Sequence, residues 1–445
     1  MATDSEQIKT FGPVDERSLE QLRSCLADVG TAGVLCADHH PGYSQPIGGG
    51  VAYRDHISPS GVGYDIACGN KAVRTPLKLE DVPIAATLDE IVERISFGMG
   101  RSNKEPVADH PVLDAIRQAP FAPQRELYDL AAKQLGTVGA GNHYVDLFAD
   151  EDDHVWIGVH FGSRGFGHKT ASGFLSLAQG RAFRSAPASD AMDAPPTLLS
   201  LETELGQGYL EAMRLAGEYA YAGRDWVVDR VLRILGTEAD YEVHNHHNFA
   251  WLEEHFGERV WVIRKGCTPA FPGQPGFVGA SMGGDAVILA GVESPDAVEA
   301  MYSTVHGAGR VMSRTQAAGK LGNVYECTER DCGFHVTPRD YDEERRRREV
   351  AGDERFSLCP DHPTGRMKKR RKRVKEGRVD FEAVQARLRR QGIELRGGAA
   401  DEAPEVYKDL DEVLAAHQGT IRVLHRLRPV GVAMAGADTF DPFKD

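Results

Sequence analysis

The order of apolar and polar positions along this chain predicts a mixture of helices and strands. Helices are expected where apolar residues recur with helical spacing, at 18–29, 87–95, 124–134, 381–391 and, as two successive helices, 198–235. Buried strands are expected in short runs rich in β-branched residues, at 155–159, 260–263 and 286–289. The stretch 185–197 is expected to be a loop. Helices and strands alternate without the regular spacing of a doubly wound sheet, so we expect a mixed α/β fold.

Composition and charge narrow the class of protein. The chain has 445 residues, of which 41% are hydrophobic and 27% charged, as in a globular protein of one to about three domains. Residues 1–10 are polar, so no signal peptide is predicted, and no apolar run approaches the roughly 18 residues of a membrane span. Seven cysteines without regular pairing favour a reducing compartment, so we expect a cytoplasmic protein. A net charge of −14 by itself argues against a nucleic-acid partner.

The stretch 305–314 combines a histidine, small residues and two arginines. The small residues 307–309 allow backbone N–H groups to approach an anion closely. Arg310 and Arg314 can bind phosphate oxygens through paired N–H groups. A histidine held against a phosphate, here His306, can act as a nucleophile or as an acid or base. Taken alone, the stretch also fits a glycine-rich turn before a polar helix.

Further histidines lie in loops of the same kind, at 139–146, 160–168 and 244–249, and the loop 61–69 adds an aspartate and a cysteine. Together these loops offer five candidate metal ligands: Asp65, Cys68, His143, His160 and His247. Asp65 and Cys68 are three residues apart, so both face one point if the turn after Gly63 is helical. A thiolate can bridge two cations, and ligand softness favours zinc while leaving manganese and iron open.

A cluster of cysteines and histidines lies between residues 327 and 362. Its spacing is typical of a structural zinc site. The candidate ligands are Cys327, Cys332, Cys359 and either His362 or His335. The intervening residues 338–344 are too polar to bury a core, so we expect the metal to fold this segment. A disordered loop with incidental cysteines is the alternative.

A local basic run qualifies the argument from net charge. Residues 366–375 include eight lysines and arginines. Nucleic-acid binding needs only a local basic face, so this run is a candidate contact, with a solvated charge run as the alternative. A second run, 345–348, is flanked by acids and is expected to be a helix face.

Taken in chain order, these motifs resemble those of the RtcB family of RNA ligases, which join a 3′-phosphate or 2′,3′-cyclic phosphate end to a 5′-hydroxyl end. The matching segments are 61–69, 139–146, 160–168, 245–250, 264–270, 279–283, 306–314 and 407–413. A single glycine loop would be a weak signal, whereas eight motifs in family order are specific. The resemblance extends over most of the chain between residues 38 and 436.

The resemblance implies a mechanism with GTP, two manganese ions and one histidine. His306 attacks the α-phosphate of GTP, the guanylate moves to the RNA 3′-phosphate, and the 5′-hydroxyl then displaces GMP. A cyclic phosphate is opened first. The implied manganese ligands are Asp65, Cys68, His143, His160 and His247, with Cys68 shared by both ions. His247 is chosen over His244 and His246 because the family's ligand directly precedes the asparagine of that motif.

The resemblance also implies nucleotide and RNA contacts. The expected nucleotide contacts are Asn142, Asp146, Ser281, Ala308, Gly309, Arg310 and Tyr407. Arg164 matches a loop arginine suited to an RNA phosphate. Three positions depart from the family: Asp146 stands where the family has Glu, Ala286 replaces a second serine, and 432–436 lacks the lysine of a Val-Lys-Gly motif. Losing that lysine costs about 1–3 kcal/mol of nucleotide binding, so selectivity for guanine is the property most affected.

These inferences combine into one expected architecture and function. We expect one large RtcB-like body with a central catalytic cleft between β-sheets and flanking helices, and a small metal-clipped insertion. The expected parts are a ligase body at 1–325, a zinc-binding insertion at 326–363, and a basic segment with the C-terminal part of the body at 364–445. The expected activity is GTP- and manganese-dependent RNA ligation in RNA repair or tRNA splicing, without a membrane.

Two alternatives belong to other functional classes. One is a metal-dependent phosphodiesterase acting on cyclic-phosphate RNA ends, and the other is a non-catalytic RNA-binding relative. The presence of His306 opposes the first, and five intact candidate ligands oppose the second. The natural RNA and the need for an archease-type activator are left open.

Overall fold

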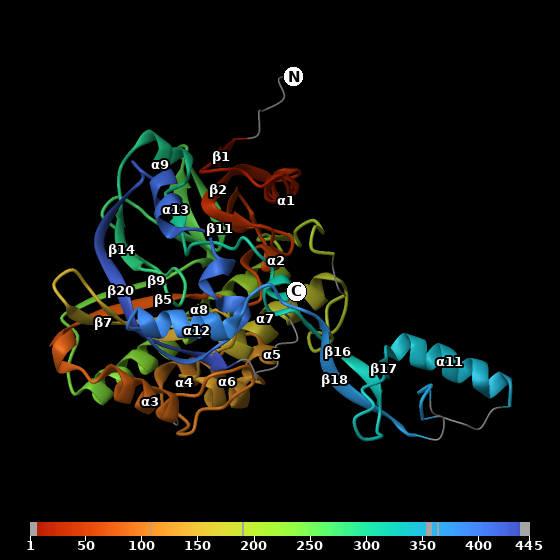
Figure 1. Cartoon of the computed structure of the whole chain (residues 1–445). Helices are drawn as coiled ribbons and strands as arrows, with labels where there is room; N and C mark the ends of the chain where they lie inside the picture. Colours follow the sequence, from red (N-terminus) through yellow and green to blue (C-terminus); the bar gives the residue numbers. More distant parts are fainter. Residues whose placement is uncertain (1–6, 108, 189–190, 353–357, 363–364, 437–445) are drawn as a thin grey trace. The chain divides into compact units, whose positions relative to one another are not determined.

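A computed structural model describes residues 7–107, 109–188, 191–352, 358–362 and 365–436. Within these residues it shows the predicted mixed α/β fold (Figure 1). The chain divides into two compact units, one containing the described residues up to Met312 and from Phe381 onward, the other Ser313–Asp380. The predicted insertion 326–363 lies within the second unit. Among the described residues, no helix combines the length and apolar character needed to cross a membrane.

Two β-sheets form the framework of the first unit. The smaller contains β1 (Ile8–Thr10), β2 (Gly30–His40), β3 (Ile47–Tyr53), β10 (Asn248–His255) and β11 (Glu258–Lys265), in the spatial order β1-β2-β3-β11-β10. The larger contains β5 (Gly69–Lys78), β6 (Tyr144–Ala149), β7 (His154–Phe161), β9 (Tyr241–His246), β13 (Pro275–Val278), β14 (Ala286–Gly291) and β20 (Ile421–Gly436), in the order β13-β14-β20-β6-β7-β5-β9. β19 (Glu394–Gly398) pairs with β20. The strands predicted at 155–159, 260–263 and 286–289 are confirmed.

Two short strand pairs complete the β-structure of this unit. They are β4 (His56–Ile57) with β8 (Leu199–Ser200), and β12 (Cys267–Pro269) with β15 (Ser303–Val305). The described part of 185–197 contains no helix or strand, as expected.

The helices of the first unit are α1 (Glu16–Leu26), α2 (Pro59–Val62), α3 (Ile84–Arg94), α4 (Pro111–Arg117), α5 (Ala122–Arg125), α6 (Tyr128–Gln134), α7 (Arg164–Ala178), α8 (Glu204–Leu235), α9 (Pro295–Glu299), α12 (Phe381–Arg390) and α13 (Leu410–Ala416). Short 3₁₀ turns lie at Leu79–Asp81, Ala400–Glu402 and Pro404–Val406. The helices predicted at 18–29, 87–95 and 381–391 are confirmed with small shifts at their ends. The helical stretch predicted at 124–134 is confirmed in part, because the chain breaks between α5 and α6.

The two helices predicted at 198–235 are wrong. Residues 199–200 form a strand, and one helix of 32 residues, α8, follows. Thr203 caps its start, with a hydroxyl that accepts the N–H of Gly206 at 3.1 Å, and Gly236 caps its end with a φ of 67°. Glycines inside the helix allow close packing instead of ending it: a Cβ on Gly217 would lie 2.9 Å from the ring of Phe249.

The length of α8 follows from packing against both sheets. Its first half, including Tyr209 and Tyr219, belongs to an apolar cluster with α1, α7 and residues of β3 and β11. Its second half, including Val227 and Val231, packs with α3 on residues of β5, β6 and β7. Apolar side chains of β2, β11 and β14 form a further cluster with α13. Buried area of this kind outweighs the low helix propensity of the glycines.

The second unit is built differently. It contains α10 (Arg314–Ala318), α11 (Pro338–Val350) and a sheet of β16 (Lys320–Cys327), β17 (His335–Val336) and β18 (Met367–Lys375), in the order β17-β16-β18. The basic run 345–348 is a helix face, as predicted: Arg345 and Arg348 pair along α11 with Glu349 and Glu344. The two ends of the unit meet, since the backbone N–H groups of residues 378 and 379 donate to the carbonyls of residues 316 and 317 at 2.9 and 3.2 Å.

Candidate active site

The segment between α2 and β5 places two predicted metal ligands side by side. The backbone N–H of Cys68 donates to the carbonyl oxygen of Asp65 at 3.0 Å, so both side chains leave one tight turn. Ala67 in this turn has a φ of 54°, in the left-handed region. The two side chains converge as predicted, but on a reverse turn and not on the helical turn that the prediction named as its condition. The chain makes a single reverse turn because β5 begins directly after it, at Gly69.

Five side chains converge as two sets of three that share one sulfur. In the first set, Nε2 of His143 lies 3.1 Å from Oδ2 of Asp65 and 3.6 Å from Sγ of Cys68. In the second set, Nε2 of His160 lies 3.6 Å from the same sulfur. A ring nitrogen of His247 lies within 4.8 Å of both of those atoms. These separations allow one cation in each set, with the thiolate between the two cations.

Hydrogen bonds decide which ring nitrogen of His160 carries the proton. Asn70 on β5 donates through Nδ2 to the carbonyl oxygen of Phe277 at 2.9 Å, which leaves its Oδ1 to accept. Nδ1 of His160 donates to that oxygen at 2.6 Å. A neutral imidazole with its proton on Nδ1 has a lone pair on Nε2. Nε2 is therefore available to a cation beside Cys68.

Burial and neighbouring charges set the protonation of these ligands. Burial raises the pKa of Cys68 well above its ordinary value, and the Asp65 carboxylate raises it further. Burial lowers the pKa of His160 and of His247, which keeps both rings neutral. Burial alone would raise the pKa of Asp65, but the hydrogen bond and charge of His143 lower it to about 2. The carboxylate and the neutral rings are the forms that bind a divalent cation.

The donor set fits a borderline divalent cation. It combines a hard carboxylate oxygen, imidazole nitrogens and a soft sulfur, which manganese, iron and zinc all accept. Nδ1 of His247 is buried and has no hydrogen-bond partner among the described residues. Buried polar atoms without partners are uncommon in proteins, and they are found where an ion or ligand binds.

Arg224, which the sequence did not point to, supports this cluster from α8. It is fully buried, and its Nη1 donates to the carbonyl oxygens of Ala67 at 2.9 Å and Phe161 at 2.7 Å. It thereby joins the turn of Cys68 to the strand that carries His160. Its Nε donates to Nε2 of His244 at 2.9 Å, so His244 has a supporting position. The neighbouring His246 contacts the hydroxyl of Tyr221 at 2.7 Å instead.

His306 directly follows β15 and is held by an aspartate from β2. Oδ2 of Asp38 accepts from Nδ1 of His306 at 2.7 Å, from its backbone N–H at 3.0 Å and from that of Gly307 at 3.3 Å. Burial opposes the charge of Asp38, but His306 keeps the pKa of this carboxyl below its ordinary value. Because the carboxylate only accepts, Nδ1 carries the proton and Nε2 has the lone pair. The ring of His306 lies 4.7 Å from that of His247, centroid to centroid.

The rest of the His306 loop is fixed by close backbone approach and by Arg310. Gly309 has a φ of 76°, and a Cβ there would overlap the carbonyl oxygen of Asp38, so the position requires glycine. Arg310 donates to the hydroxyl of Tyr407 at 3.2 Å and to the carbonyl oxygen of Asp401 at 2.7 Å. Two predicted nucleotide contacts, Arg310 and Tyr407, are thus joined to each other beside the loop.

Other predicted contacts surround the two ligand sets. Nδ2 of Asn142 lies 3.4 Å from Nε2 of His160. The half-buried guanidinium of Arg164 donates to the hydroxyl of Thr137 and the carbonyl oxygen of Gly98, both at 3.3 Å, and its charge helps to lower the pKa of Asp65. Ala308 is buried within the His306 loop, and Ser281 follows β13 in the loop that leads to Ala286 on β14.

The positions that depart from the family pattern lie on neighbouring strands. Asp146 on β6 pairs in register with Val432 on β20, and its Oδ1 accepts the backbone N–H of Ala433 at 3.3 Å. Burial raises the pKa of Asp146 well above its ordinary value. Residues 432–436, which lack the family's lysine, therefore lie beside Asp146, the aspartate that stands where the family has glutamate.

The predicted zinc ligands gather in the second unit. Cys327, Cys332, Cys359 and His362 have donor atoms that all lie within 4.8 Å of one another. The alternative ligand, His335, is exposed, and its Nδ1 contacts the carbonyl oxygen of Gly333 at 3.0 Å. The geometry thus favours His362 as the fourth ligand.

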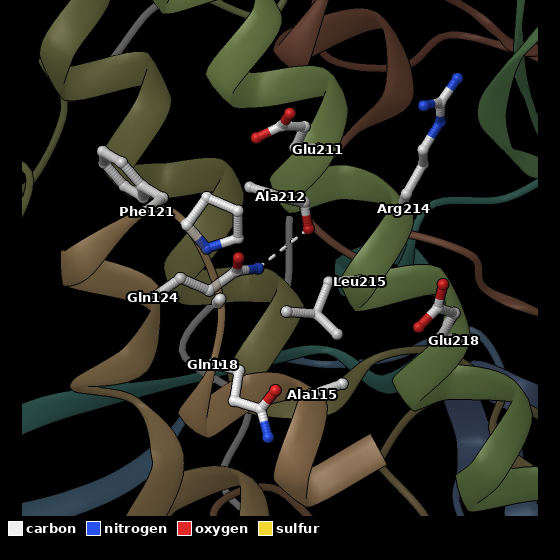
Figure 2. Close-up of a pocket in the computed structure, with 11 residues that line it drawn as sticks. Ala115, Gln118, Phe121, Gln124, Glu211, Ala212, Arg214, Leu215 and Glu218 are labelled. Carbon is white, nitrogen blue, oxygen red and sulfur yellow. Dashed lines mark hydrogen bonds between the residues drawn. The ribbon is translucent and has the colours of Figure 1, made fainter. Parts of the chain in front are cut away.

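A surface pocket elsewhere contains none of these residues. Figure 2 shows it between α4, α5 and α8, where Gln124 donates through Nε2 to the carbonyl oxygen of Ala212 at 2.9 Å. This polar side chain is already bonded within the protein, and no cluster of ligating groups lines the pocket. We assign it no role.

Comparison with known proteins decides the family. A family model described as tRNA-splicing ligase RtcB matches residues 21–122, 116–341 and 350–435. The chain belongs to the RtcB family. One RtcB relative is the RNA-splicing ligase RtcB of Escherichia coli K12, 30% identical over 88% of this chain and 87% of that protein. Others are the tRNA-splicing ligase RtcB of Aeropyrum pernix, 29% identical over 92% and 89%, and the RNA-splicing ligase RtcB of Mycobacterium bovis, 28% identical over 91% and 97%.

The RtcB match includes every residue of the two ligand sets. Residues 21–122 contain Asp38, Asp65 and Cys68, and residues 116–341 contain the histidines from His143 to His306. The match is interrupted between residues 341 and 350, within α11 of the second unit.

Proposed function

We propose that this RtcB-family chain is an RNA ligase that uses GTP and two manganese ions to join a 3′-phosphate or 2′,3′-cyclic phosphate end to a 5′-hydroxyl end. The observation that carries the proposal is the placement of His306. Its Nδ1 is held by Asp38, and its ring adjoins His247, a member of one of two ligand sets that share Cys68.

The two ligand sets supply the manganese sites of this proposal. Asp65, Cys68 and His143 would hold one ion, and Cys68, His160 and His247 would hold the other. Bound divalent cations neutralise charge that develops on phosphoryl oxygens and help to align the reacting groups. Arg224 and Asn70 keep the ligands in place by the hydrogen bonds described above.

His306 is the proposed nucleophile of the first step. The lone pair on Nε2 attacks the α-phosphorus of GTP, a P–N bond forms, and pyrophosphate leaves. The ring gains positive charge as the bond forms, and the buried Asp38 carboxylate stabilises that charge through Nδ1. The backbone N–H of Gly307 is bonded to Asp38, so the N–H groups of Ala308 and Gly309 are the proposed donors to the guanylate oxygens.

Two further transfers complete the reaction. An oxygen of the RNA 3′-phosphate attacks the guanylate phosphorus, which breaks the P–N bond and frees His306. The 5′-hydroxyl then attacks the activated RNA phosphorus, and GMP leaves. A cyclic phosphate must first be hydrolysed to the 3′-phosphate. Arg164, beside Asp65, is the proposed contact to an RNA phosphate, and the proposed nucleotide contacts are Asn142, Asp146, Ser281, Ala308, Gly309, Arg310 and Tyr407.

Guanylylation of the free protein tests this proposal. Wild-type protein incubated with α-labelled GTP and Mn²⁺ should gain an acid-labile label, as expected for a P–N bond, and should seal matched RNA ends. His306→Ala should neither gain the label nor seal RNA. The control His425→Ala, on β20 and outside both ligand sets, should gain the label and seal RNA. Retained label on His306→Ala would refute the assigned nucleophile.

The same assay separates the alternatives. A phosphodiesterase would open the cyclic phosphate without taking up label, and an RNA-binding relative would do neither reaction. Parallel reactions with GTP and ATP measure the selectivity for guanine, which we expect Asp146 and the missing lysine to affect. Reactions with and without an archease-type activator show whether one is needed.

A further inference from the structure

The second unit holds a cluster of metal-ligating side chains that the proposed ligation does not use. Nδ1 of His362 lies 3.3 Å from Sγ of Cys332, 3.5 Å from Sγ of Cys359 and 3.9 Å from Sγ of Cys327. Sγ of Cys332 lies 3.3 Å from Sγ of Cys359, and none of the cysteines forms a disulfide bond. A tetrahedral zinc ion with bonds of about 2.3 Å to sulfur and 2.0 Å to nitrogen separates its ligand atoms by roughly 3.5–3.8 Å. The observed separations are close to the edges of that tetrahedron.

The second unit has few buried apolar side chains to stabilise it. Its buried apolar side chains, among the described residues, are Ala317, Val324, Cys327 and Cys359, and two of these four are cluster cysteines. Helix α11 buries no residue and contacts the sheet through a stack of Tyr341 on Tyr325, with ring centroids 3.7 Å apart. A unit with so small a core needs a staple, and a structural metal supplies one.

The cluster lies at one end of the β16–β18 ladder. Cys327, the last residue of β16, pairs in register with Met367, the first residue of β18. The N–H of Thr328 donates to the carbonyl oxygen of Arg366 at 2.9 Å, just beyond the ladder. A metal ion held by Cys327 therefore fixes the register at which β18 begins.

Charge separates this unit from the rest of the chain. Residues 313–380 contain 18 lysines and arginines against 13 acids, a net charge of +5, whereas the rest of the chain contains 34 against 53. The positive charge is concentrated on β18, which has β16 as its neighbour on one side and is the edge of its sheet. Lys368, Lys369 and Arg370 are exposed there, while Lys372 pairs with Glu326 at 2.5 Å.

Cations on an edge strand have a simpler explanation, because lysines also prevent edge-to-edge aggregation. One or two charges achieve that, however, and β18 has seven among nine residues in a chain of net charge −14. Successive side chains of a strand point to opposite faces, so Lys368 and Arg370 share one face and Lys369 lies on the other. Both faces of the edge are therefore positive, as suits a polyanion that lies along it.

We infer that Cys327, Cys332, Cys359 and His362 bind one structural zinc ion, and that this ion holds the basic edge strand β18 in place to bind the phosphate backbone of RNA. The RNA part rests on the function proposed above. The zinc part does not. The binding is a backbone contact, so it adds affinity without selecting sequence.

Metal analysis tests the zinc site on the full chain. The Cys68→Ser background removes the shared ligand of the other site, so residual zinc comes from the cluster. The Cys68→Ser protein should retain one zinc per chain after dialysis. As a control, the same protein with His335→Ala added should also retain it. Adding Cys332→Ser should remove it. Cobalt in place of zinc should give the absorption of a tetrahedral thiolate site, and Cys332→Ser should abolish it. Zinc that persists in Cys332→Ser would overturn the assignment.

RNA affinity tests the strand, measured by anisotropy with a short labelled single-stranded RNA bearing a 3′-phosphate. The test variant combines Lys368→Glu, Lys369→Glu and Arg370→Glu. The control changes the charge equally on α11, with Arg339→Glu, Arg346→Glu and Arg347→Glu. Three lost phosphate contacts reduce the slope of log K against log salt by about 2 and weaken binding up to about a hundredfold near 0.1 M salt. The helix variant should change the slope by much less.

The outcomes separate this inference from the proposed function. Guanylylation of His306 needs no RNA, so the strand variant and Cys359→Ser should both keep it. Cys359→Ser should nevertheless bind RNA as weakly as the strand variant, because β18 loses its anchor. Equal weakening by the strand and helix variants, or unchanged RNA binding in Cys359→Ser, would overturn the role of β18. If the wild-type protein took up no guanylate label, the ligase proposal would be refuted, whereas the zinc assignment would be unaffected.

Discussion

Replacing Asp38 by asparagine tests how the His306 loop is organised. The carboxylate accepts three N–H groups through Oδ2, from Nδ1 and the backbone of His306 and from the backbone of Gly307. Asparagine has the same shape but no charge. Its amide nitrogen would take the place of Oδ1, a buried atom without a hydrogen-bond partner among the described residues. The substitution therefore removes the charge opposite His306 and places a buried donor without an acceptor.

The magnitude follows from the two effects. A hydrogen bond to a charged group contributes about 1.5–3 kcal/mol and one to a neutral group about 0.5–1.5 kcal/mol, so losing the charge costs about 1–2 kcal/mol. If that loss falls on the transition state, guanylylation slows by roughly 5- to 30-fold. The unsatisfied donor lowers the free energy of unfolding by about 1–3 kcal/mol in addition.

The matched control is Asp150→Asn. The carboxylate of Asp150 is also buried and accepts three N–H groups, from Nε1 of Trp156 and from the backbones of Asp152 and His154, in the turn between β6 and β7. Single-turnover guanylylation and thermal unfolding should be measured on both variants. Both should lose stability, and Asp38→Asn alone should slow guanylylation. A normal guanylylation rate in Asp38→Asn would show that Asp38 has a structural role only.

Three further predictions concern the metal ligands, the loop and the core. Cys68→Ser exchanges a shared thiolate for a weak neutral ligand, so metal counting should find both ions depleted; full occupancy would remove Cys68 from the sites. Gly309→Ala forces a side chain toward the carbonyl of Asp38 at positive φ, so guanylylation should fall sharply, and a normal rate would contradict the observed loop. Glu253→Gln leaves the buried Arg264 without its carboxylate, which should cost about 3–5 kcal/mol of unfolding free energy by denaturant titration at pH 7. Burial opposes the charge of Glu253, but Arg264 keeps its pKa lowered, so this stabilisation is present above the unfolded pKa of about 4.3 and should disappear as pH falls through the lower folded value; a pH-independent difference would refute this account.

The sequence predicted the loops of the candidate ligands because each has a local signature. His143, His160 and His306 are each followed or preceded by small residues, so the motif is visible without the fold. Asp38 has no such signature, since its partner His306 is 268 residues away. The same applies to Arg224, which bonds a carbonyl 157 residues away, and to Asn70, 90 residues from His160. These supporting residues follow from strand pairing, which local patterns do not encode.

Secondary structure failed where packing overrides local preference. The helix α8 is continuous because its two halves pack against different sheets, and a window of sequence contains neither sheet. The sequence predicted that Asp65 and Cys68 could face one point on a helical turn, whereas they do so on a reverse turn. That geometry depends on β5, which must begin at Gly69 in register with His246 on β9.

The paired ends of the second unit make it a detachable module. The chain enters near Gln316 and leaves near Arg378, and the hydrogen bonds between these ends close the base of the unit. A segment with a closed base can lengthen or shorten at little expense, because each doubling of a loop costs only about 0.6 kcal/mol of closure entropy. Insertions, deletions or exchanges of residues between these paired ends should therefore leave the surrounding chain undisturbed. A new RNA preference could be introduced by replacing this unit alone, with the candidate active-site residues unchanged.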